Sequence, residues 1–289
     1  MGKEVKLDWE DEAFRKKVDT VIQRALEEDI GPGDVTTDSI VPHGLGLTGQ
    51  LIAKERGVVA GILVMKRVFE LLDPEINFQI LVKDASWVQS GDIVAIVEGN
   101  SRALLKGERV ALNFLQRMSG IATLTHRFVE AVRHTHAKIL DTRKTAPGLR
   151  LLDKWAVRLG GGMNHRFGLY DMVLIKENHI AAAGGITKAV NKVKQKIKDS
   201  MPIEVETKTL EEVKEAMALP IQRILLDNMD VVTIQKAVEM VCGKIPLEAS
   251  GNISIENVVE VAETGVDYIS VGKLTHSVKA VDFSFLLES

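Results

Sequence analysis

The chain has 289 residues, of which 45% are hydrophobic and 27% charged, and its formal net charge is −3. This length allows one large or two ordinary domains, and the composition is that of a globular protein. The charge balance is not that of a nucleic-acid binder, and no apolar run approaches the roughly 18 to 20 residues that span a bilayer. Residues 1–12 are polar and acidic, unlike a signal peptide, and the single cysteine, Cys242, excludes an internal disulfide and a cysteine-based metal cluster. We therefore expect a cytoplasmic protein that binds neither nucleic acid nor membrane.

The first part of the chain is typical of a mixed domain of helices and strands. Residues 10–29 place apolar side chains at helical spacing, and Gly31-Pro32-Gly33 ends this predicted helix. The small polar side chains of residues 33–38 indicate a structural turn. Four strand-like segments follow at 47–54, 58–62, 78–82 and 93–98, with a helix at 64–72. We predict an α+β sandwich domain from this pattern of helices and strands.

A long helix is predicted over residues 107–133. Its apolar positions recur at helical spacing, and polar side chains lie opposite them at Arg109, Asn113 and Gln116. From this pattern alone, the polar side is a solvated helix face.

After this helix, short apolar runs alternate with helical patterns. The predicted strands span 138–141, 172–176, 203–207, 223–227, 246–250 and 268–271. Units of this kind, joined by right-handed crossovers, give a parallel sheet. Because each run ends in a polar residue, we favour closure into a barrel, with an open doubly wound sheet as the alternative. The predicted domains are 1–115, a sandwich joined by the tail 276–289, and 116–275, a barrel.

Polar residues at the ends of these strands would meet at one mouth of a barrel, where such folds keep their active sites. Cations suited to carboxylates or phosphates are Arg143, Lys144, Arg166 and Lys176. Glu206 and Asp227 are carboxylates suited to sugar hydroxyls or a hydrated Mg²⁺. Two glycine-containing turns, 250–252 and 271–273, follow the last two strands and let backbone N–H groups approach an anion.

The cations in this prediction have no matching acids, so their mutual repulsion favours a bound polyanion. Alternation along the strand does not separate Glu204 from Glu206, but the position at the strand's end favours Glu206. His165 and His179 are not expected to bind a metal, because no third ligand stands at a zinc-like spacing.

Several short motifs occur along the chain from about Glu27 to the C-terminus. They are Gly33–Thr36, Gly107–Asn113, Thr142–Gly148, Gly161–Arg166, Lys176–His179, Leu226–Asn228, Glu248–Asn252 and Val271–His276. No single motif is decisive, but in their order and spacing the set specifically resembles the quinolinate phosphoribosyltransferases, the enzymes also called nicotinate-nucleotide pyrophosphorylases.

The resemblance implies an N-terminal α/β sandwich, an incomplete α/β barrel and a head-to-tail homodimer, with a hexamer left open. Arg109 would then reach into the neighbouring subunit's site. The residues implied to bind quinolinate are Arg109, Arg143, Lys144, His165, Arg166 and Lys176. Those implied to bind phosphoribosyl pyrophosphate are Glu206, Asp227, Ser250, Gly251, Asn252, Gly272, Lys273 and His276. The implied catalytic set is Lys144, Lys176, Glu206 and Asp227, and its two carboxylates would hold Mg²⁺ indirectly.

The implied reaction transfers a phosphoribosyl group to quinolinate with loss of CO₂, giving nicotinate mononucleotide and pyrophosphate for NAD synthesis. Such a reaction needs no covalent nucleophile, because its task is to position two polyanions and to stabilise the leaving group. The alternatives are a paralogue of the same fold with another substrate, a Schiff-base aldolase acting through Lys176, and a non-catalytic anion-sensing subunit.

Overall fold

The computed structural model describes residues 6–197 and 201–288, and contacts divide the chain into two compact units. We call 6–126, 145–161 and 277–288 the N-terminal unit, and the described part of 127–144 and 162–276 the barrel unit. The predicted fold class is confirmed, because the first unit contains an antiparallel sheet and the second a parallel one.

Two aspartates begin the first two helices. Asp11 accepts hydrogen bonds from the N–H groups of Ala13 and Phe14 at the start of α1 (Glu12–Ile30). The apolar side chains of α1 that are buried are Phe14, Val18, Ile22 and Leu26. The predicted turn at 33–38 is wrong, because this stretch forms helix α2 (Val35–Ile40). Asp34 accepts the N–H of Thr37 and thereby caps this helix.

An antiparallel sheet with the order β12-β1-β5-β3 forms the centre of the N-terminal unit. Its strands are β1 (Gly46–Ala53), β3 (Asn77–Ile80), β5 (Ile93–Asn100) and β12 (Phe283–Glu288). The tail of the chain therefore supplies an edge strand, β12, that pairs with β1. Gly49 makes this possible, because a side chain there would collide with the ring of Phe285.

The strand predicted at 58–62 is much shorter in the structure. Only β2 (Gly57–Val58) is extended, and it pairs with β4 (Trp87–Val88), which was not predicted. Helix α3 (Ile62–Leu72) begins at the next residues, because Asp84 accepts the N–H groups of Gly61 and Ile62 at 2.7 and 2.9 Å. A carboxylate from a distant turn thus decides where this helix starts.

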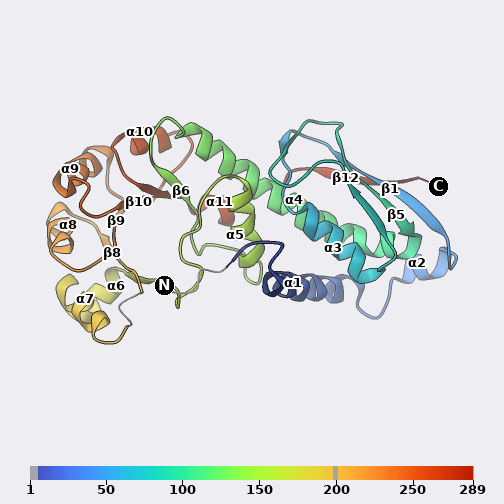
Figure 1. Cartoon of the computed structure of the whole chain (residues 1–289), viewed down its shortest axis with the longest axis horizontal. Coiled ribbons are helices and arrows are strands. Elements are labelled where there is room, and N and C mark those ends of the chain that lie inside the picture. Colours follow the sequence, from blue (N-terminus) through green and yellow to red (C-terminus); the bar gives the residue numbers. More distant parts are fainter. Residues whose placement is uncertain (1–5, 198–200, 289) are drawn as a thin grey trace. The chain divides into compact units, whose positions relative to one another are not determined.

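The long predicted helix is α4 (Ser101–Ala131), which lies beside α3 (Figure 1). Gly107 allows this approach, since an added Cβ would meet the ring of Phe69 in α3. The predicted domain boundary at 115/116 falls inside α4. Arg109 and Asn113 are exposed in the single chain, as a solvated face requires. That prediction is wrong for Gln116, whose amide donates a hydrogen bond to the carbonyl oxygen of Phe283 at 3.0 Å.

Residues 145–161 pack with the N-terminal unit, although they lie between two segments of the barrel unit. Helix α5 (Arg150–Leu159) stacks Trp155 on Trp9, with 5.7 Å between the ring centroids. The carboxylate of Asp153, which is fully buried, accepts two hydrogen bonds of 2.8 Å from the guanidinium of Arg117. Contacts that are distant in sequence therefore assign α5 to this unit.

The barrel unit contains a parallel sheet with the order β6-β11-β10-β9-β8-β7. Its strands are β6 (Lys138–Leu140), β7 (Val173–Ile175), β8 (Ile203–Thr207), β9 (Arg223–Asp227), β10 (Leu247–Ser250) and β11 (Tyr268–Ser270). Each of these strands was predicted to within about a residue at either end.

The strand order decides between a barrel and a doubly wound sheet. Strands β7 to β11 lie side by side in sequence order, and β11 pairs with β6, the first strand. A doubly wound sheet would instead reverse its order at a switch point. Within the described residues β6 and β7 do not pair, and Leu140 forms an isolated bridge with Met163 at this seam. The barrel is therefore incomplete.

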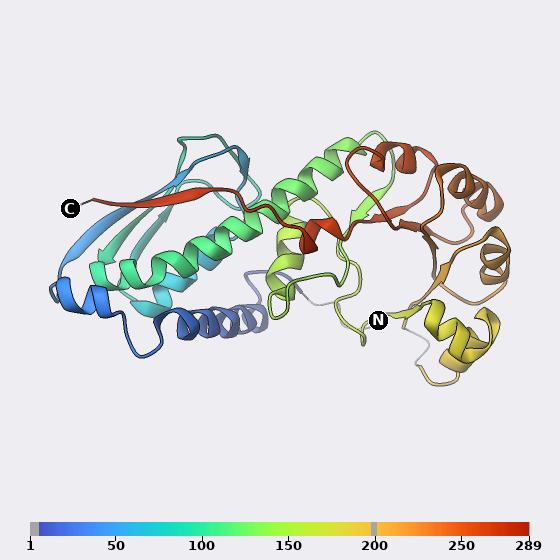
Figure 2. The ribbon, with the colours of Figure 1, turned by 180° about the vertical axis from the view of Figure 1, so that it is seen from behind.

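Helices cover the outer side of this curved sheet (Figure 2). They are α6 (Glu177–Ala183), α7 (Ile186–Lys194), α8 (Leu210–Met217), α9 (Val231–Val241) and α10 (Val258–Glu263). The short α11 (Lys273–His276) lies instead at the carboxyl end of β11. Over residues 6–197 and 201–288, no helix combines the length and the apolar character that crossing a membrane requires.

The contact of Asp84 with the start of α3 predicts a pH-dependent stability. Burial of the carboxyl outweighs the backbone N–H groups of Ile62 and Gly61 and raises the pKa of Asp84 from 3.8 to about 6. The folded state therefore binds this proton more tightly than the unfolded state. The stabilisation is complete below pH 3.8 and is lost as the pH rises through about 6.

Asp84→Asn keeps a hydrogen-bond acceptor without the charge. Its free energy of unfolding at pH 8 should therefore be equal to or above that of the unchanged protein. Asp84→Ala removes the acceptor and should lower the free energy of unfolding by about 1 kcal/mol. Urea unfolding at pH 8 measures both. Equal losses in the two variants would contradict this account.

Candidate active site

A cavity of about 830 Å³ lies at the carboxyl ends of the barrel strands. All of its lining residues belong to the barrel unit. They are Thr142, Arg143, Lys144, His165, Arg166, Leu174, Lys176, Glu206, Leu225, Asp227, Asn228, Glu248, Ser250, Gly251, Asn252, Ile253, Ser270, Gly272, Lys273 and His276. The structure thus brings together every predicted site residue except Arg109, which lies on α4 in the N-terminal unit.

Lys176 and Glu206 form an ion pair across the ends of β7 and β8, with 3.2 Å between Nζ and Oε2. The other oxygen of Glu206 accepts the N–H of Glu177 at 3.3 Å, and Glu177 itself pairs with Lys208. The expectation of cations without matching acids is therefore wrong for Lys176. The sequence pattern missed this pairing because the two residues end different strands.

The turns after β9 and β10 are joined by asparagine side chains. The amide of Asn228 donates to the carboxylate of Asp227 at 3.1 Å and accepts from the amide of Asn252, also at 3.1 Å. Asn228 and Asn252 have positive φ angles of +54° and +51°, which asparagine tolerates better than most residues. At Gly251, with φ of +100°, a side chain would collide with the amide of Asn228. Glycine at this position keeps the turn narrow beside Asp227.

The turn after β11 brings a lysine and a histidine together. A Cβ at Gly272 would lie 3.0 Å from Cδ of Lys144 and 3.2 Å from the ring of His276. The hydroxyl of Thr275, which is buried, donates to the carbonyl oxygen of Lys144 at 2.8 Å. The end of β6 and helix α11 are thus held together at one corner of the cavity.

Arg166 lies on a stretch with no regular secondary structure. Its guanidinium donates to the carbonyl oxygen of Met172 at 3.2 Å. Burial and the charge of Arg143 lower the pKa of Arg166, which means that two cations face the same part of the cavity. An anion bound there would relieve their repulsion.

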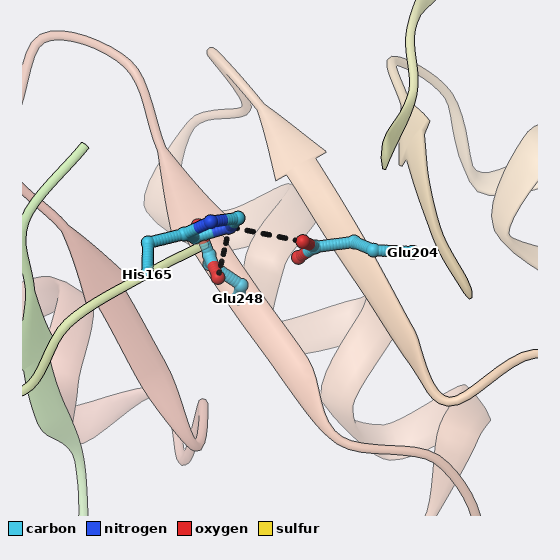
Figure 3. Close-up of side chains that lie close together, drawn as sticks. All are labelled: His165, Glu204 and Glu248. Carbon is cyan, nitrogen blue, oxygen red and sulfur yellow. Dashed lines mark ion pairs between the residues drawn. The ribbon is translucent and has the colours of Figure 1, made fainter. Parts of the chain in front are cut away.

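A buried cluster of charged side chains adjoins this part of the cavity through His165 and Glu248. Figure 3 shows three of its members. Nε2 of His165 is 2.9 Å from Glu204 and 3.4 Å from Glu248, and both carboxylates are fully buried. Arg223 contacts Glu248 at 2.8 Å and Glu204 at 4.0 Å, and it stacks on Tyr268 at 4.1 Å from the ring centroid. Four neighbouring strands, β8 to β11, each supply one of these partners.

The protonation of His165 is subject to two opposing effects. Burial lowers the pKa of His165, but the two carboxylates outweigh it and raise the pKa to about 9. Nδ1 accepts the backbone N–H of Arg166 at 2.8 Å, and a nitrogen that accepts a hydrogen bond cannot carry a proton. The proton that the two carboxylates favour therefore lies on Nε2, which faces them.

The two glutamates differ in their acidity. Burial and the charge of Glu248 raise the pKa of Glu204, so this carboxyl resists ionisation. Burial also acts against ionisation of Glu248, but the hydrogen bond with His165 and the charge of Arg223 lower its pKa to about 2. His165 and Arg223 both face Glu248 and stabilise its charged form.

The sequence pattern favoured Glu206 over Glu204 and indicated no role for Glu248 or Arg223. The available signal was the shared strand parity of Glu204 and Glu206, which places both side chains inside the barrel. Three of the clustered side chains, His165, Glu204 and Glu248, are close enough to hold a metal ion. Arg223 already contacts both carboxylates, so we interpret the cluster as protein groups that pair with one another.

Comparisons with known proteins agree with this geometry. Two family models match the chain: the N-terminal domain of quinolinate phosphoribosyl transferase over residues 34–119 and its C-terminal domain over residues 121–286.

Individual relatives are similar over most of the chain. The chloroplastic nicotinate-nucleotide pyrophosphorylase of Arabidopsis thaliana is 47% identical, over 93% of this chain and 82% of its own length. A decarboxylating quinolinate phosphoribosyltransferase of Nicotiana tabacum is 46% identical with the same coverage. The solved structure of the nicotinate-nucleotide pyrophosphorylase of Francisella tularensis is 41% identical, with a TM-score of 0.90 over 94% of this chain and 96% of that one. The chain therefore belongs to the quinolinate phosphoribosyltransferase family.

Proposed function

We infer that this protein is a decarboxylating quinolinate phosphoribosyltransferase, a glycosyltransferase of NAD biosynthesis. The observation that carries this conclusion is one cavity lined by cations, carboxylates and glycine-containing turns. Such a cavity suits two polyanionic substrates. Membership of the family supports this function.

The reaction consists of two displacements of electron pairs. The ring nitrogen of quinolinate attacks the anomeric carbon of phosphoribosyl pyrophosphate, and the bond from that carbon to pyrophosphate breaks. The pyridine ring then carries positive charge, so it can take up the electron pair of the adjacent carboxylate as CO₂ leaves, and a proton fills the vacant position. The protein's task is to align the substrates and to stabilise separated charge.

The cations of the cavity would hold quinolinate. Arg143 and Arg166 are suited to fix the two carboxylates by paired N–H groups, with His165 beside them. Lys144 and Lys176 would screen the repulsion between substrates. Lys176 is available for this once Glu206 turns to another cation.

That other cation would be Mg²⁺, which binds with phosphoribosyl pyrophosphate and neutralises the leaving pyrophosphate. Glu206 and Asp227 fit such an ion, because they end adjacent strands, line the same cavity and offer the oxygen ligands that Mg²⁺ prefers. They would act indirectly, through water or the ribose hydroxyls. The turns at 250–252 and 272–276 would hold the 5′-phosphate through Ser250, Gly251, Asn252, Gly272, Lys273 and His276.

The protein would work in the cytoplasm as a homodimer in which Arg109 completes the partner's site, and further assembly into a hexamer is open. The exposure of Arg109 in the single chain supports this arrangement. The domain division at 115/116 would separate the part that carries Arg109 from the barrel. No role with nucleic acid or membrane is proposed.

A Schiff-base aldolase is the main alternative of another class. Lys176 is engaged by Glu206 at 3.2 Å, whereas a Schiff-base lysine must react as a free amine. A paralogue with another substrate and an anion-sensing subunit are the remaining alternatives.

The first experiment follows CO₂ and nicotinate mononucleotide from purified protein with quinolinate, phosphoribosyl pyrophosphate and Mg²⁺. Product should require all three components, and EDTA should abolish it. Reaction of nicotinate in place of quinolinate would show that the two-carboxylate pocket is misassigned. Binding of quinolinate without turnover would indicate the anion-sensing subunit, and trapping of a keto substrate by borohydride would indicate the aldolase.

Arg166→Ala should raise the KM for quinolinate about a hundredfold and lower kcat, because a charged, two-point contact with a carboxylate is lost. The KM for phosphoribosyl pyrophosphate should change little. Steady-state kinetics with each substrate varied in turn measures both. Unchanged kinetics would remove Arg166 from the quinolinate site.

Mixing two inactive variants tests whether Arg109 acts across a dimer. In a heterodimer of Arg109→Ala and Arg166→Ala chains, one site would receive both intact arginines and the other neither. Random exchange of subunits should therefore restore about a quarter of the full activity. If Arg109 served its own chain, mixing would restore none.

A further inference from the structure

His165 and Arg166 lie outside helices and strands, so the hydrogen bonds of regular structure do not place them. Side chains of other segments hold this stretch instead. Asp141, fully buried at the end of β6, accepts the N–H of His165 at 2.9 Å and the amide of Asn164 at 2.6 Å. The backbone of the stretch is thereby fixed on the side that faces β6.

The ring of His165 supplies the contact on the opposite side. Its Nδ1 accepts the backbone N–H of Arg166 at 2.8 Å, and its Nε2 contacts Glu204 at 2.9 Å and Glu248 at 3.4 Å. One imidazole thus connects two buried carboxylates to the backbone of Arg166. Figure 3 shows the ring lying between these carboxylates.

Burying charged side chains inside a barrel costs desolvation free energy. Well-packed apolar side chains of the same volume are often as stabilising as buried ion pairs, or more so. Glu204 and Glu248 are fully buried, and Arg223 is held between them and Tyr268. The cluster therefore calls for an explanation other than stability, and His165 links it to the backbone of Arg166.

We propose that Glu204 is a positioning residue, which with Glu248 and Arg223 fixes the His165 ring and through it the orientation of Arg166 toward the substrate's carboxylates. This inference rests on the assignment of Arg166 to quinolinate made above. Glu204 does not line the cavity, so it acts through His165 and not by touching the substrate. Glu248 reaches the cavity lining and is less suited to a test of positioning alone.

Glu204→Met removes both oxygens while keeping a similar volume. It should raise the KM for quinolinate about tenfold and leave the KM for phosphoribosyl pyrophosphate within about twofold, because only the quinolinate side depends on Arg166. Glu204→Gln keeps an oxygen near Nε2, so it should raise the KM for quinolinate only about threefold and leave the KM for phosphoribosyl pyrophosphate unchanged. Glu239→Met, on the exposed side of α9, is the matched control and should change neither KM.

The same substitution in the Arg166→Ala background separates positioning from a general loss of structure. If Glu204 acts through Arg166, the double variant should have the quinolinate KM of Arg166→Ala alone. Equal rises in both KM values, or additive effects in the double variant, would overturn the proposal. An unchanged quinolinate KM in Arg166→Ala would instead overturn the assignment of Arg166, so the two failures are distinguishable.

Thermal unfolding shows whether each variant is folded before its kinetics are read. If Glu204→Met does not fold, Glu204→Gln carries the test. Its threefold effect on quinolinate should disappear in the Arg166→Ala background. Persistence of that effect would count against the proposal.

Discussion

The pairing of parallel strands in one cyclic order is the constraint on which the cavity depends. Because β7 to β11 and β6 run in the same direction, their carboxyl ends meet at a single rim. Residues separated by more than a hundred positions, such as Arg143 and Gly272, line one cavity for this reason. Each of the strands β7 to β11 contributes one or two side chains, and most of the other lining residues lie in the turns that follow the strands. The site's composition therefore follows from the order of the strands.

The charged side chains of the barrel form two layers. The upper layer, represented by Lys176 and Glu206, is partly open, and its ion pair can be exchanged for contacts with ligands. The lower layer is closed: Glu204 and Glu248 are fully buried and face His165 and Arg223. Exposed pairs are weak and replaceable, whereas buried pairs are rigid because leaving either partner alone is costly.

Much of the barrel could be predicted from the sequence, because short apolar runs that end in polar residues are a local signal. Two of the three segments whose prediction failed depend on distant partners. Asp84 shortens a predicted strand from a remote turn. The exception is local, because Asp34 caps a helix where a turn was predicted. Residues 145–161 are assigned to the N-terminal unit by contacts such as Trp9 with Trp155. Most of the cavity's lining could be predicted, because its residues lie at or just after strand ends. The cluster around His165 could not, because its members meet only when the neighbours of each strand are known.

The edge strand β12 bears on how the chain acquires its shape during synthesis. Leu51 in β1 pairs with Phe285 in β12, so one of the first strands to leave the ribosome waits for one of the last. Until residues 283–288 have been made, β1 exposes an unpaired edge, which is a template for association with other chains. The barrel strands are made during that interval. The N-terminal unit therefore cannot complete its sheet until all of the barrel strands have been made, although most of its residues come first.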